Sequence, residues 1–426
     1  MIKQTINQAL TLFRQNPLLS AISILGTAFA ICFIMVLVIS WQVKYKAAVP
    51  ETNLERSMFI RSLSSKYKGK EGWMNSWYAS PALMKELVLP SKYVETATAA
   101  SPSTLVLLAT TDESVCLSLD SRYTDPEFWK IYQFRFVDGR PFMETDRQEE
   151  GGDAIVVSAA IARKLFGTEK AAGNSVLMNR RYKRIVGVVE DVSLTAVHAY
   201  SQMWAMYGSS MLRVPASADG YRNDFEITIL ARSSEDFTLI HQDIRNRLAQ
   251  MNSSFADFEL EIYGQPDDPV TARNRIFPDP DMTGMYWQYG IALLVILLVP
   301  ALNLCGLSNS RMQQRMSELG VRKAYGSTRQ MLLRHILNEN LILTLLGGIL
   351  GFIVSYGVVY WLREWIFSTF WTVYAHGSVE MPVSSLFSPL VFVYALLFCL
   401  LMNLLSVGIP AWHASGKPIV VSLNDK

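Results

Sequence analysis

Charged residues, cysteine and histidine are all scarce in this sequence. Of its 426 residues only 18% are Asp, Glu, Lys or Arg, and there are four Cys and five His. So few charges exclude an intrinsically disordered chain, and so few cysteines exclude a disulfide-rich scaffold. Cys32, Cys305 and Cys399 lie in long apolar stretches, and only Cys116 lies outside them. No disulfide can therefore form within the more polar part of the chain, although Cys116 could pair with another chain.

The sequence also lacks the motifs of the common catalytic and cofactor sites. It has no H-E-x-x-H, no paired-cysteine spacing and no G-x-S-x-G. Its two Gly-Lys pairs, at 69–70 and 416–417, follow no glycine-rich loop and precede no Ser or Thr, so there is no Walker A motif. We therefore predict a non-catalytic chain that binds no metal and no cofactor. Several acidic residues are interpreted as a solvated surface: Asp112, Glu113, Glu149, Glu150, Glu190 and Asp191.

Four stretches contain no Asp, Glu, Lys or Arg at all: 15–43, 282–310, 340–362 and 381–416. Each is longer than the roughly 20 apolar residues that cross a bilayer. Core helices of soluble proteins rarely run so long without a charge. The first stretch is also too long for a signal peptide, and no A-x-A cleavage site closes it. We predict four transmembrane helices, at 18–41, 284–307, 336–362 and 389–411.

The basic residues of the short loops predict the orientation. Residues 308–335 carry six Lys or Arg and one Glu, whereas residues 363–388 carry one Arg and two Glu. Because Lys and Arg collect in cytoplasmic loops, the first loop is predicted to be cytoplasmic and the second external. Both termini, 1–17 and 412–426, are then cytoplasmic, and residues 42–283 form a large external domain.

This external domain has the pattern of an α+β fold. Period-two apolar runs predict strands at 104–110, 153–158, 182–192, 225–232 and 258–263, and helical patterns follow at 159–167 and 235–252. The proline-containing segment 264–283 is predicted to be a loop that leads back to the membrane. Residues 42–281 carry 28 basic and 32 acidic side chains, a net charge of −4, so no nucleic-acid partner is expected.

No charged residue lies in the middle of a predicted span. Intramembrane charges usually mark ion or proton paths, so a secondary transporter driven by ions is disfavoured. Asn303 and Asn403 are the polar exceptions, and we expect them to hydrogen-bond between helices. In the third span Gly347, Gly351 and Ser355 recur every four residues. They predict a small-residue face for helix packing, either within the chain or in a dimer.

The predicted cytoplasmic loop has a pattern of its own. Met312, Met316 and Leu319 stand at helical spacing among basic residues, which predicts an amphipathic helix near the membrane surface. Gly320 and Gly326 then interrupt the pattern. A short helix between two spans could transmit force from a cytoplasmic partner to both of them. The alternative is a basic loop held by anionic lipid.

Residues 303–352, NLCGLSNSRMQQRMSELGVRKAYGSTRQMLLRHILNENLILTLLGGILGF, resemble the signature of the MacB/FtsX-type permeases of type VII ABC transporters. In that family a coupling segment E-[IL]-G-[IV]-R-[KR]-A-x-G-[AS] stands between two spans, and the second span contains L-G-G-x-x-G. Weaker likenesses cover 126–142, 163–192 and 408–423. The matching residues of the signature are Glu318, Leu319, Gly320, Val321, Arg322, Lys323, Ala324, Gly326, Ser327, Gly347, Gly348 and Gly351.

The resemblance implies an inner-membrane protein with four transmembrane α-helices and a large α+β periplasmic domain inserted between the first two. Such permeases form dimers and dock two ATPase domains, which hold ATP and Mg. Closure of the ATPase domains moves the periplasmic domain rather than passing substrate through the membrane, a mechanism called mechanotransmission. Because this chain has no ATPase motif, we expect the ATPase on a separate subunit. The expected docking and coupling residues are Arg315, Glu318, Gly320, Arg322, Lys323 and Gly326.

The resemblance leaves three functions open. The first is efflux or envelope export, for which a periplasmic adaptor would be a partner. The second, in the manner of FtsX, is regulation of a periplasmic cell-wall hydrolase or a signalling role. The third is lipoprotein release. The external domain shows no substrate motif that separates them, and whether the dimer is homomeric or heteromeric stays open as well.

Overall fold

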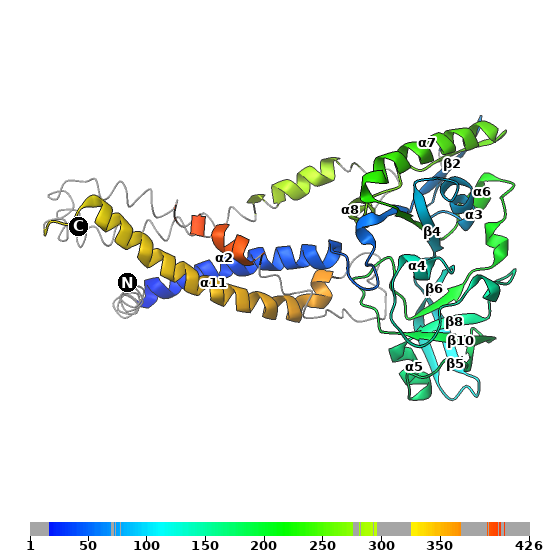
Figure 1. The fold of residues 1–426 in the computed structure, drawn as a ribbon, viewed down its shortest axis with the longest axis horizontal. Helices are drawn as coiled ribbons and strands as arrows, with labels where there is room; N and C mark the ends of the chain where they lie inside the picture. Colours follow the sequence, from blue (N-terminus) through cyan, green and yellow to red (C-terminus); the bar gives the residue numbers. More distant parts are fainter. Residues whose placement is uncertain are drawn as a thin grey trace. The chain divides into compact units, whose positions relative to one another are not determined.

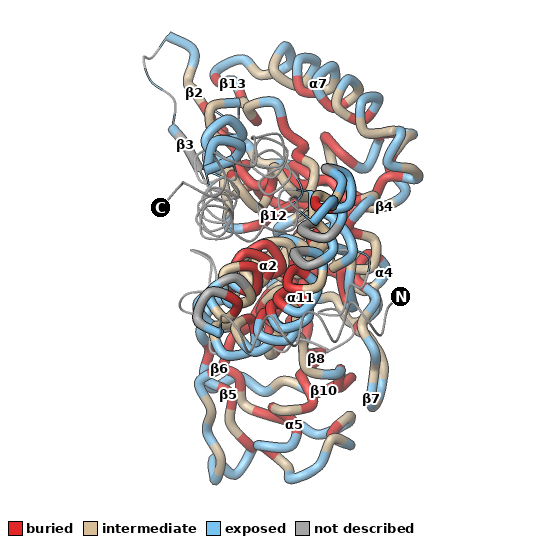
Figure 2. Tube along the Cα trace, turned by 90° about the vertical axis from the view of Figure 1, so that its left-hand side faces the viewer, coloured by how far each residue is buried: buried red, intermediate tan, exposed pale blue. Residues whose placement is uncertain are grey.

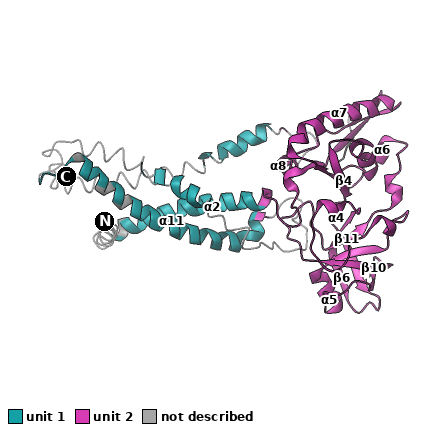
Figure 3. Cartoon of the chain, viewed as in Figure 1, with its two compact units in different colours: residues 1–43, 283–366, 382–426 teal, residues 44–282, 367–381 magenta. Residues whose placement is uncertain are grey.

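The computed structural model describes residues 17–69, 72, 74–76, 78–275, 281, 283–292, 294–295, 325–367, 390, 392–398, 400–401 and 404. The chain divides into two compact units (Figure 3). Unit 1 comprises Met1–Val43, Thr283–Ile366 and Pro382–Lys426, and unit 2 comprises Lys44–Met282 and Phe367–Met381.

Unit 1 is built from long apolar helices (Figure 1). In the described part of the chain, two helices are long and apolar enough to cross a membrane, within α2 (Pro17–Tyr45) and α11 (Arg329–Phe367). They cover the first and third predicted spans and extend beyond both. Residues 283–292 are helical too, at the start of the second predicted span. Most of the second and fourth predicted spans lies outside the described residues.

Unit 2 contains three sheets. The first has the order β1-β12-β4 and is antiparallel throughout, and the second, with seven strands, has the order β7-β10-β8-β11-β6-β5-β9. Two of its pairs, β10 with β8 and β11 with β6, are parallel. The third sheet has the order β13-β2-β3. The strands are β1 (Ser57–Ile60), β2 (Leu63–Tyr67), β3 (Met74–Ser76), β4 (Val94–Ala100), β5 (Thr104–Thr110), β6 (Cys116–Thr124), β7 (Phe136–Gly139), β8 (Ala154–Ser158), β9 (Ser175–Met178), β10 (Arg181–Val189), β11 (Met203–Met206), β12 (Glu226–Ala231) and β13 (Phe258–Glu261).

The longer helices of unit 2 start and stop at clear local signals. α5 (Ala159–Phe166) begins where the Ser158 hydroxyl accepts a hydrogen bond from the Ile161 N–H, and it ends at Gly167 in the left-handed conformation. α7 (Phe237–Ser254) is buried along one side and exposed along the other (Figure 2). The remaining helices are short: α3 (Pro81–Leu83), α4 (Phe128–Ile131), α6 (Ala218–Tyr221), α8 (Pro269–Asn274), the π-helix η2 (Met84–Val88) and the 3₁₀ turns η1 (Leu54–Arg56), η3 (Glu144–Asp146), η4 (Ser209–Leu212) and η5 (Ser234–Asp236).

Three large hydrophobic clusters form most of the core among the described residues of unit 2, and a small fourth cluster contains Leu54, Phe59 and Ala272. The first joins β1, β12 and β4 to the inner side of α7, where Ile240, Ile244 and Leu248 are buried. The other two large clusters cover opposite faces of the seven-stranded sheet. Strand β8 shows this clearly, because Ile155 belongs to one cluster and Val156 to the other. A strand buried on both faces needs a continuous apolar run, and β8 has the sequence AIVVS.

The prediction of an α+β domain is confirmed for unit 2, and each predicted strand and helix has a counterpart there. One prediction was wrong, because α8 lies within the predicted loop 264–283. Its start follows from local chemistry. The Asp268 side chain accepts hydrogen bonds from the N–H groups of Val270 and Thr271, and Pro269 occupies the first helical position. Several short polar strands, such as LSSKY of β2, were missed because they lack an apolar period.

Candidate functional site

The chain enters and leaves the external domain through two segments that are joined by an ion pair and a hydrogen bond. The incoming segment, 44–51, begins with the last two residues of α2, and the outgoing segment, 265–275, contains α8. Arg273 Nη2 lies 2.9 Å from Glu51 Oε2, and the two side chains are only 10% and 4% exposed. Asn274 Nδ2 donates to Tyr45 Oη over 3.1 Å. A buried ion pair and a hydrogen bond therefore link the two connections.

The same pair is anchored to the segment 193–200. Glu51 Oε1 accepts hydrogen bonds from the backbone N–H groups of His198, at 2.7 Å, and Ala199, at 3.1 Å. Arg273 Nη1 donates to the Thr195 carbonyl over 3.2 Å. Both oxygens of the Glu51 carboxylate are thus used, as a buried carboxylate requires.

A second set of charges surrounds Glu226 on β12. Arg61 Nε donates to Glu226 Oε2 over 2.7 Å, and His198 Nδ1 lies 2.6 Å from Oε1. The His198 ring stacks on Phe59, with the centroids 3.9 Å apart. Burial alone would raise the pKa of the Glu226 carboxyl, but the Arg61 charge and the His198 contact outweigh it and hold that pKa far below its ordinary value. Glu226 is therefore ionised in the folded domain.

The outgoing segment is also hydrogen-bonded to β1. Phe59 and Asp267 exchange two backbone hydrogen bonds, of 2.8 and 2.7 Å. Arg275 Nη2 lies 2.8 Å from Asp267 Oδ1, and Arg61 Nη1 donates to the Ala272 carbonyl over 3.2 Å. We call these seven side chains the buried ionic network: Glu51, Arg61, His198, Glu226, Asp267, Arg273 and Arg275.

Asp125 joins the first sheet to the seven-stranded sheet. It directly follows β6, and its carboxylate accepts hydrogen bonds from Thr98 Oγ1 (2.7 Å) and Ala99 N (3.2 Å) of β4. It also accepts one from Tyr207 Oη, at 2.7 Å. Burial raises the pKa of the Asp125 carboxyl despite these donors.

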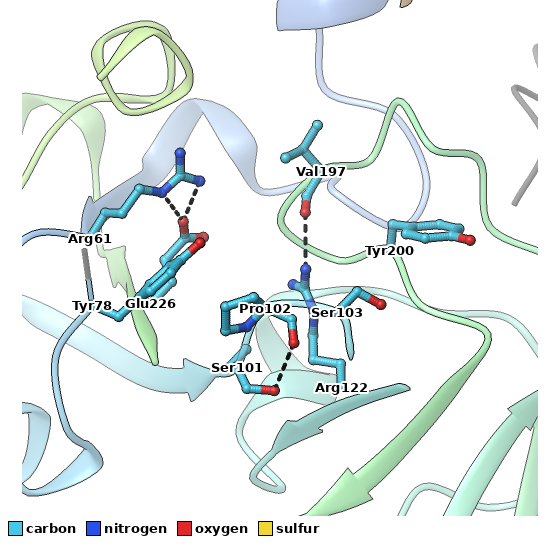
Figure 4. A pocket seen from close by; sticks show the side chains of 10 residues that line it. Arg61, Tyr78, Ser101, Pro102, Ser103, Arg122, Val197, Tyr200 and Glu226 are labelled. Atoms are coloured by element: carbon cyan, nitrogen blue, oxygen red, sulfur yellow. Dashed lines mark hydrogen bonds and ion pairs between the residues drawn. The ribbon is translucent and has the colours of Figure 1, made fainter. Parts of the chain in front are cut away.

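A small pocket lies beside the network (Figure 4). Arg61 and Glu226 line it on one side and Arg122 of β6 on another, with the connection between β4 and β5 completing its wall. Its cavity volume is about 70 Å³, close to the liquid volume of about two water molecules. The full lining is Arg61, Tyr78, Ala100, Ser101, Pro102, Ser103, Arg122, Val197, Tyr200 and Glu226.

In unit 1, two of the small residues predicted on the third span, Gly347 and Gly351, face α2. A Cβ atom built on Gly347 would lie 2.8 Å from the Ile24 carbonyl oxygen, and one on Gly351 would overlap the backbone of Ala28. Ser355 is fully buried and donates its hydroxyl to the Phe352 carbonyl over 2.7 Å. The two helices approach closely only because two positions carry no side chain.

The predicted coupling residues Arg315, Glu318, Gly320, Arg322 and Lys323 lie outside the described residues. Gly326 is described, and its φ of +88° is one that residues with a side chain rarely adopt. A Cβ atom added to Gly326 would meet no other atom within 4 Å, so the backbone conformation, and not a lack of space, favours glycine there.

The helix α11 begins shortly after this glycine. Met331 N donates to Thr328 Oγ1 over 3.3 Å, so Thr328 caps the helix. Gly326 therefore forms the turn from which α11 starts.

Sequence reasoning missed the buried ionic network. Of the acidic residues predicted to be solvated, Asp112, Glu113, Glu149, Glu150 and Glu190 are exposed, as predicted, and Asp191 is half-buried. The five histidines are scattered along the sequence, so nothing local distinguishes His198, and the burial of Glu51 was not foreseen. One signal was available: Glu226 is the acidic residue of a strand, EITILA, that is otherwise uncharged and buried throughout.

Comparisons with known proteins match both parts of the chain. A family model described as the MacB-like periplasmic core domain matches residues 20–247, more than half of the chain. A second, described as the FtsX-like permease C-terminal, matches residues 290–419. The first covers most of the external domain, and the second covers most of the region that follows it.

Three relatives illustrate the similarity. The pyoverdine export ATP-binding/permease protein PvdT of Pseudomonas syringae pv. syringae (strain B728a) is 25% identical over 55% of this chain and 34% of its own length. The ABC transporter permeases YvrN and YknZ of Bacillus subtilis (strain 168) are each 23% identical, over 55% and 59% of this chain. These matches cover 56% and 62% of the two permeases. The chain thus matches about a third of PvdT and less than two thirds of either permease.

The order of the two matched regions is the order that the sequence signature implies. An apolar helix precedes the periplasmic core domain, and the FtsX-like region follows it. The chain belongs to the MacB/FtsX-type permeases of ABC transporters.

Proposed function

We propose that this chain is the permease subunit of an ABC transporter that acts in efflux or envelope export. A separate ATPase subunit, which binds ATP and Mg, would dock on its cytoplasmic side. Hydrolysis there would drive a conformational change of the periplasmic domain. Such a chain is a non-catalytic transmitter of force.

The observation that supports this most is the link between the incoming and outgoing segments. Glu51 and Arg273 form a buried ion pair, and breaking such a pair leaves an uncompensated charge at a cost of about 3–5 kcal/mol. The two connections to the membrane helices therefore resist separation. A displacement of either helix would be passed to β1, β12 and the segment 193–200 together.

The apolar character of the helices supports the same mechanism. Residues 15–43 and 340–362 contain no charged side chain, so neither stretch offers a charged group for a substrate or proton path. We propose four spans in the inner membrane, with both termini cytoplasmic and a second permease, identical or different, completing a dimer.

The coupling segment would contact the ATPase. We assign contact or orientation of the ATPase to Arg315, Glu318, Arg322 and Lys323, and the shaping of the turn to Gly320 and Gly326. The left-handed φ of Gly326, directly before α11, suits that role. A force applied there would act on the start of the third span.

The test replaces residues of the coupling segment in the full-length chain. Glu318→Arg and Gly320→Trp should abolish complementation of a deletion strain, because ATP hydrolysis is uncoupled from periplasmic motion, while the protein still folds and inserts. Glu364→Arg, in the loop predicted to face the opposite side, is the matched control and should complement fully. If both coupling variants complement fully and still capture the ATPase, the docking assignment is wrong.

A second measurement addresses the role in export. Cross-linking in cells should capture a periplasmic adaptor or an exported compound on the external domain. Capture of a cell-wall hydrolase or of a lipoprotein instead would replace export with regulation or with lipoprotein release.

A further inference from the structure

The pocket shown in Figure 4 lies where the first sheet and the seven-stranded sheet of unit 2 meet. Glu226 comes from β12 of the first sheet, and Arg122 comes from β6 of the second. Residues 100–103, which connect β4 to β5, form the wall between them. Anything bound in this pocket would touch both sheets.

Arg122 is buried without a carboxylate partner. Its residue is 7% exposed, and among the described residues no Asp or Glu lies within ion-pair distance of it. Its two terminal nitrogens donate to the carbonyls of His198 and Val197, while Nε has no hydrogen-bond partner. A buried guanidinium with an unused donor is costly, because neither its charge nor its hydrogen-bonding capacity is satisfied.

The charges of the side chains that line the pocket do not sum to zero. Glu226 is the one carboxylate in the lining, and Arg61 and Arg122 are both arginines. Glu226 already binds Arg61 through one oxygen and His198 through the other. The lining therefore has a net charge of +1, and burial lowers the pKa of Arg122 even in the field of Glu226.

We propose that this pocket binds one small, free carboxylate, with the Arg122 side chain as its principal partner. Each terminal nitrogen of Arg122 carries a second N–H besides the one that it donates to a carbonyl, and a charged guanidinium favours a carboxylate oxygen as acceptor. Ser103 adds a hydroxyl to the lining, and its contact with Ser201 Oγ is long, at 3.5 Å. One negative charge would neutralise the site.

The size of the pocket limits the ligand. A cavity volume of about 70 Å³ is small, and it favours a carboxylate with one or two carbons over an aromatic acid. Such a ligand would join the two sheets and add rigidity to the external domain. The proposal is independent of the ATPase partner, so it can fail while the proposed function holds.

Equilibrium dialysis of the full-length purified chain against radiolabelled acetate tests the proposal. We expect saturable binding of one acetate per chain, competition by formate, and no competition by benzoate. Arg122→Gln should weaken binding at least tenfold. The matched control is Arg147→Gln, because the Arg147 side chain is also only 7% exposed and donates to a carbonyl, but it is paired with Glu144 and does not line the pocket.

Ser103→Phe provides a second variant that fills the pocket without changing its charge, and it should also abolish binding. It keeps the test decisive if Arg122→Gln does not fold. Absence of saturable acetate binding to the unaltered chain would overturn the proposal. So would equal binding in both pocket variants, or equally tight binding of sulfate or benzoate.

Discussion

One kind of contact stabilises the external domain, and a different kind stabilises the pair of membrane helices. In the external domain, buried charges such as Glu51, Arg273 and Glu226 form directional hydrogen bonds across elements distant in sequence. Between α2 and α11, Gly347 and Gly351 allow the two backbones to touch. The first kind of contact depends on exact atom positions, and the second depends on the absence of side chains.

The difference reflects the two solvents. Water drives apolar side chains of the external domain into hydrophobic clusters, and buried polar groups must then be paired. Lipid provides no comparable driving force between helices, so close packing of small residues takes its place.

The largest effect is expected from removing the central charge of the network. Glu226→Gln leaves Arg61 buried without its paired carboxylate and removes the negative charge from the pocket lining, and we expect a loss of about 3–5 kcal/mol in the free energy of unfolding. Denaturant unfolding of the full chain, followed by tryptophan fluorescence, measures it. Glu95→Gln is the control: its pair with Arg56 is exposed, so about 0–1 kcal/mol is expected. Equal losses would show that the network does not stabilise the domain.

A double-mutant cycle measures the ion pair that joins the incoming segment, 44–51, to the outgoing segment, 265–275. Glu51→Gln and Arg273→Gln, singly and together, should give a coupling energy of about 1–3 kcal/mol, because the two side chains contact each other directly. The same cycle for Arg213 and Glu149, an exposed pair, should give less than about 1 kcal/mol. Additive effects of Glu51 and Arg273 would remove the mechanical link on which the proposed function rests.

The helix interface is tested at its tightest point. Gly351→Ala places a methyl group against the Ala28 backbone and should destabilise the α2–α11 pair by about 1–3 kcal/mol. Gly357→Ala on the same helix is the control, since nothing lies within 4 Å of the added carbon, and it should be neutral or slightly stabilising. Unfolding of the micelle-bound chain by increasing amounts of a denaturing detergent measures both. Similar midpoints for the two variants would contradict close packing at Gly351.

The smallest and most gradual effect is a dependence on pH. Because the folded state lowers the pKa of Glu226 below its ordinary 4.5, the stability that its charge contributes is complete above that value and is lost as pH falls below it. The stability difference between the unaltered chain and Glu226→Gln should therefore narrow from about pH 5 downward. Burial raises the pKa of Asp125 and of Asp267, so their contribution to stability falls as pH rises. This contribution is expected to be the same in the unaltered chain and in Glu226→Gln. A difference that stays constant down to about pH 3 would contradict the ionised state of Glu226.

Local patterns predicted those elements whose surroundings are uniform. Strand β8 and helix α5 follow from an apolar run and a helical pattern, and α2 follows from an uncharged stretch. The start of α8 was also encoded, in Asp268 and Pro269, but the neighbouring prolines favoured a loop. The coupling segment was recognised by its signature alone, and its residues up to 324 lie outside the described part of the chain.

The sequence by itself determined the apolar helices, the α+β character of the external domain and the family, because each depends on neighbouring residues or on a contiguous motif. Only the tertiary structure decided which charges are buried together. Glu51 and Arg273 are 222 positions apart, and Arg61 and Glu226 are 165 apart. Nothing in the local sequence distinguishes Glu51 from a carboxylate on the surface, and the difference arises from the fold that removes water around it.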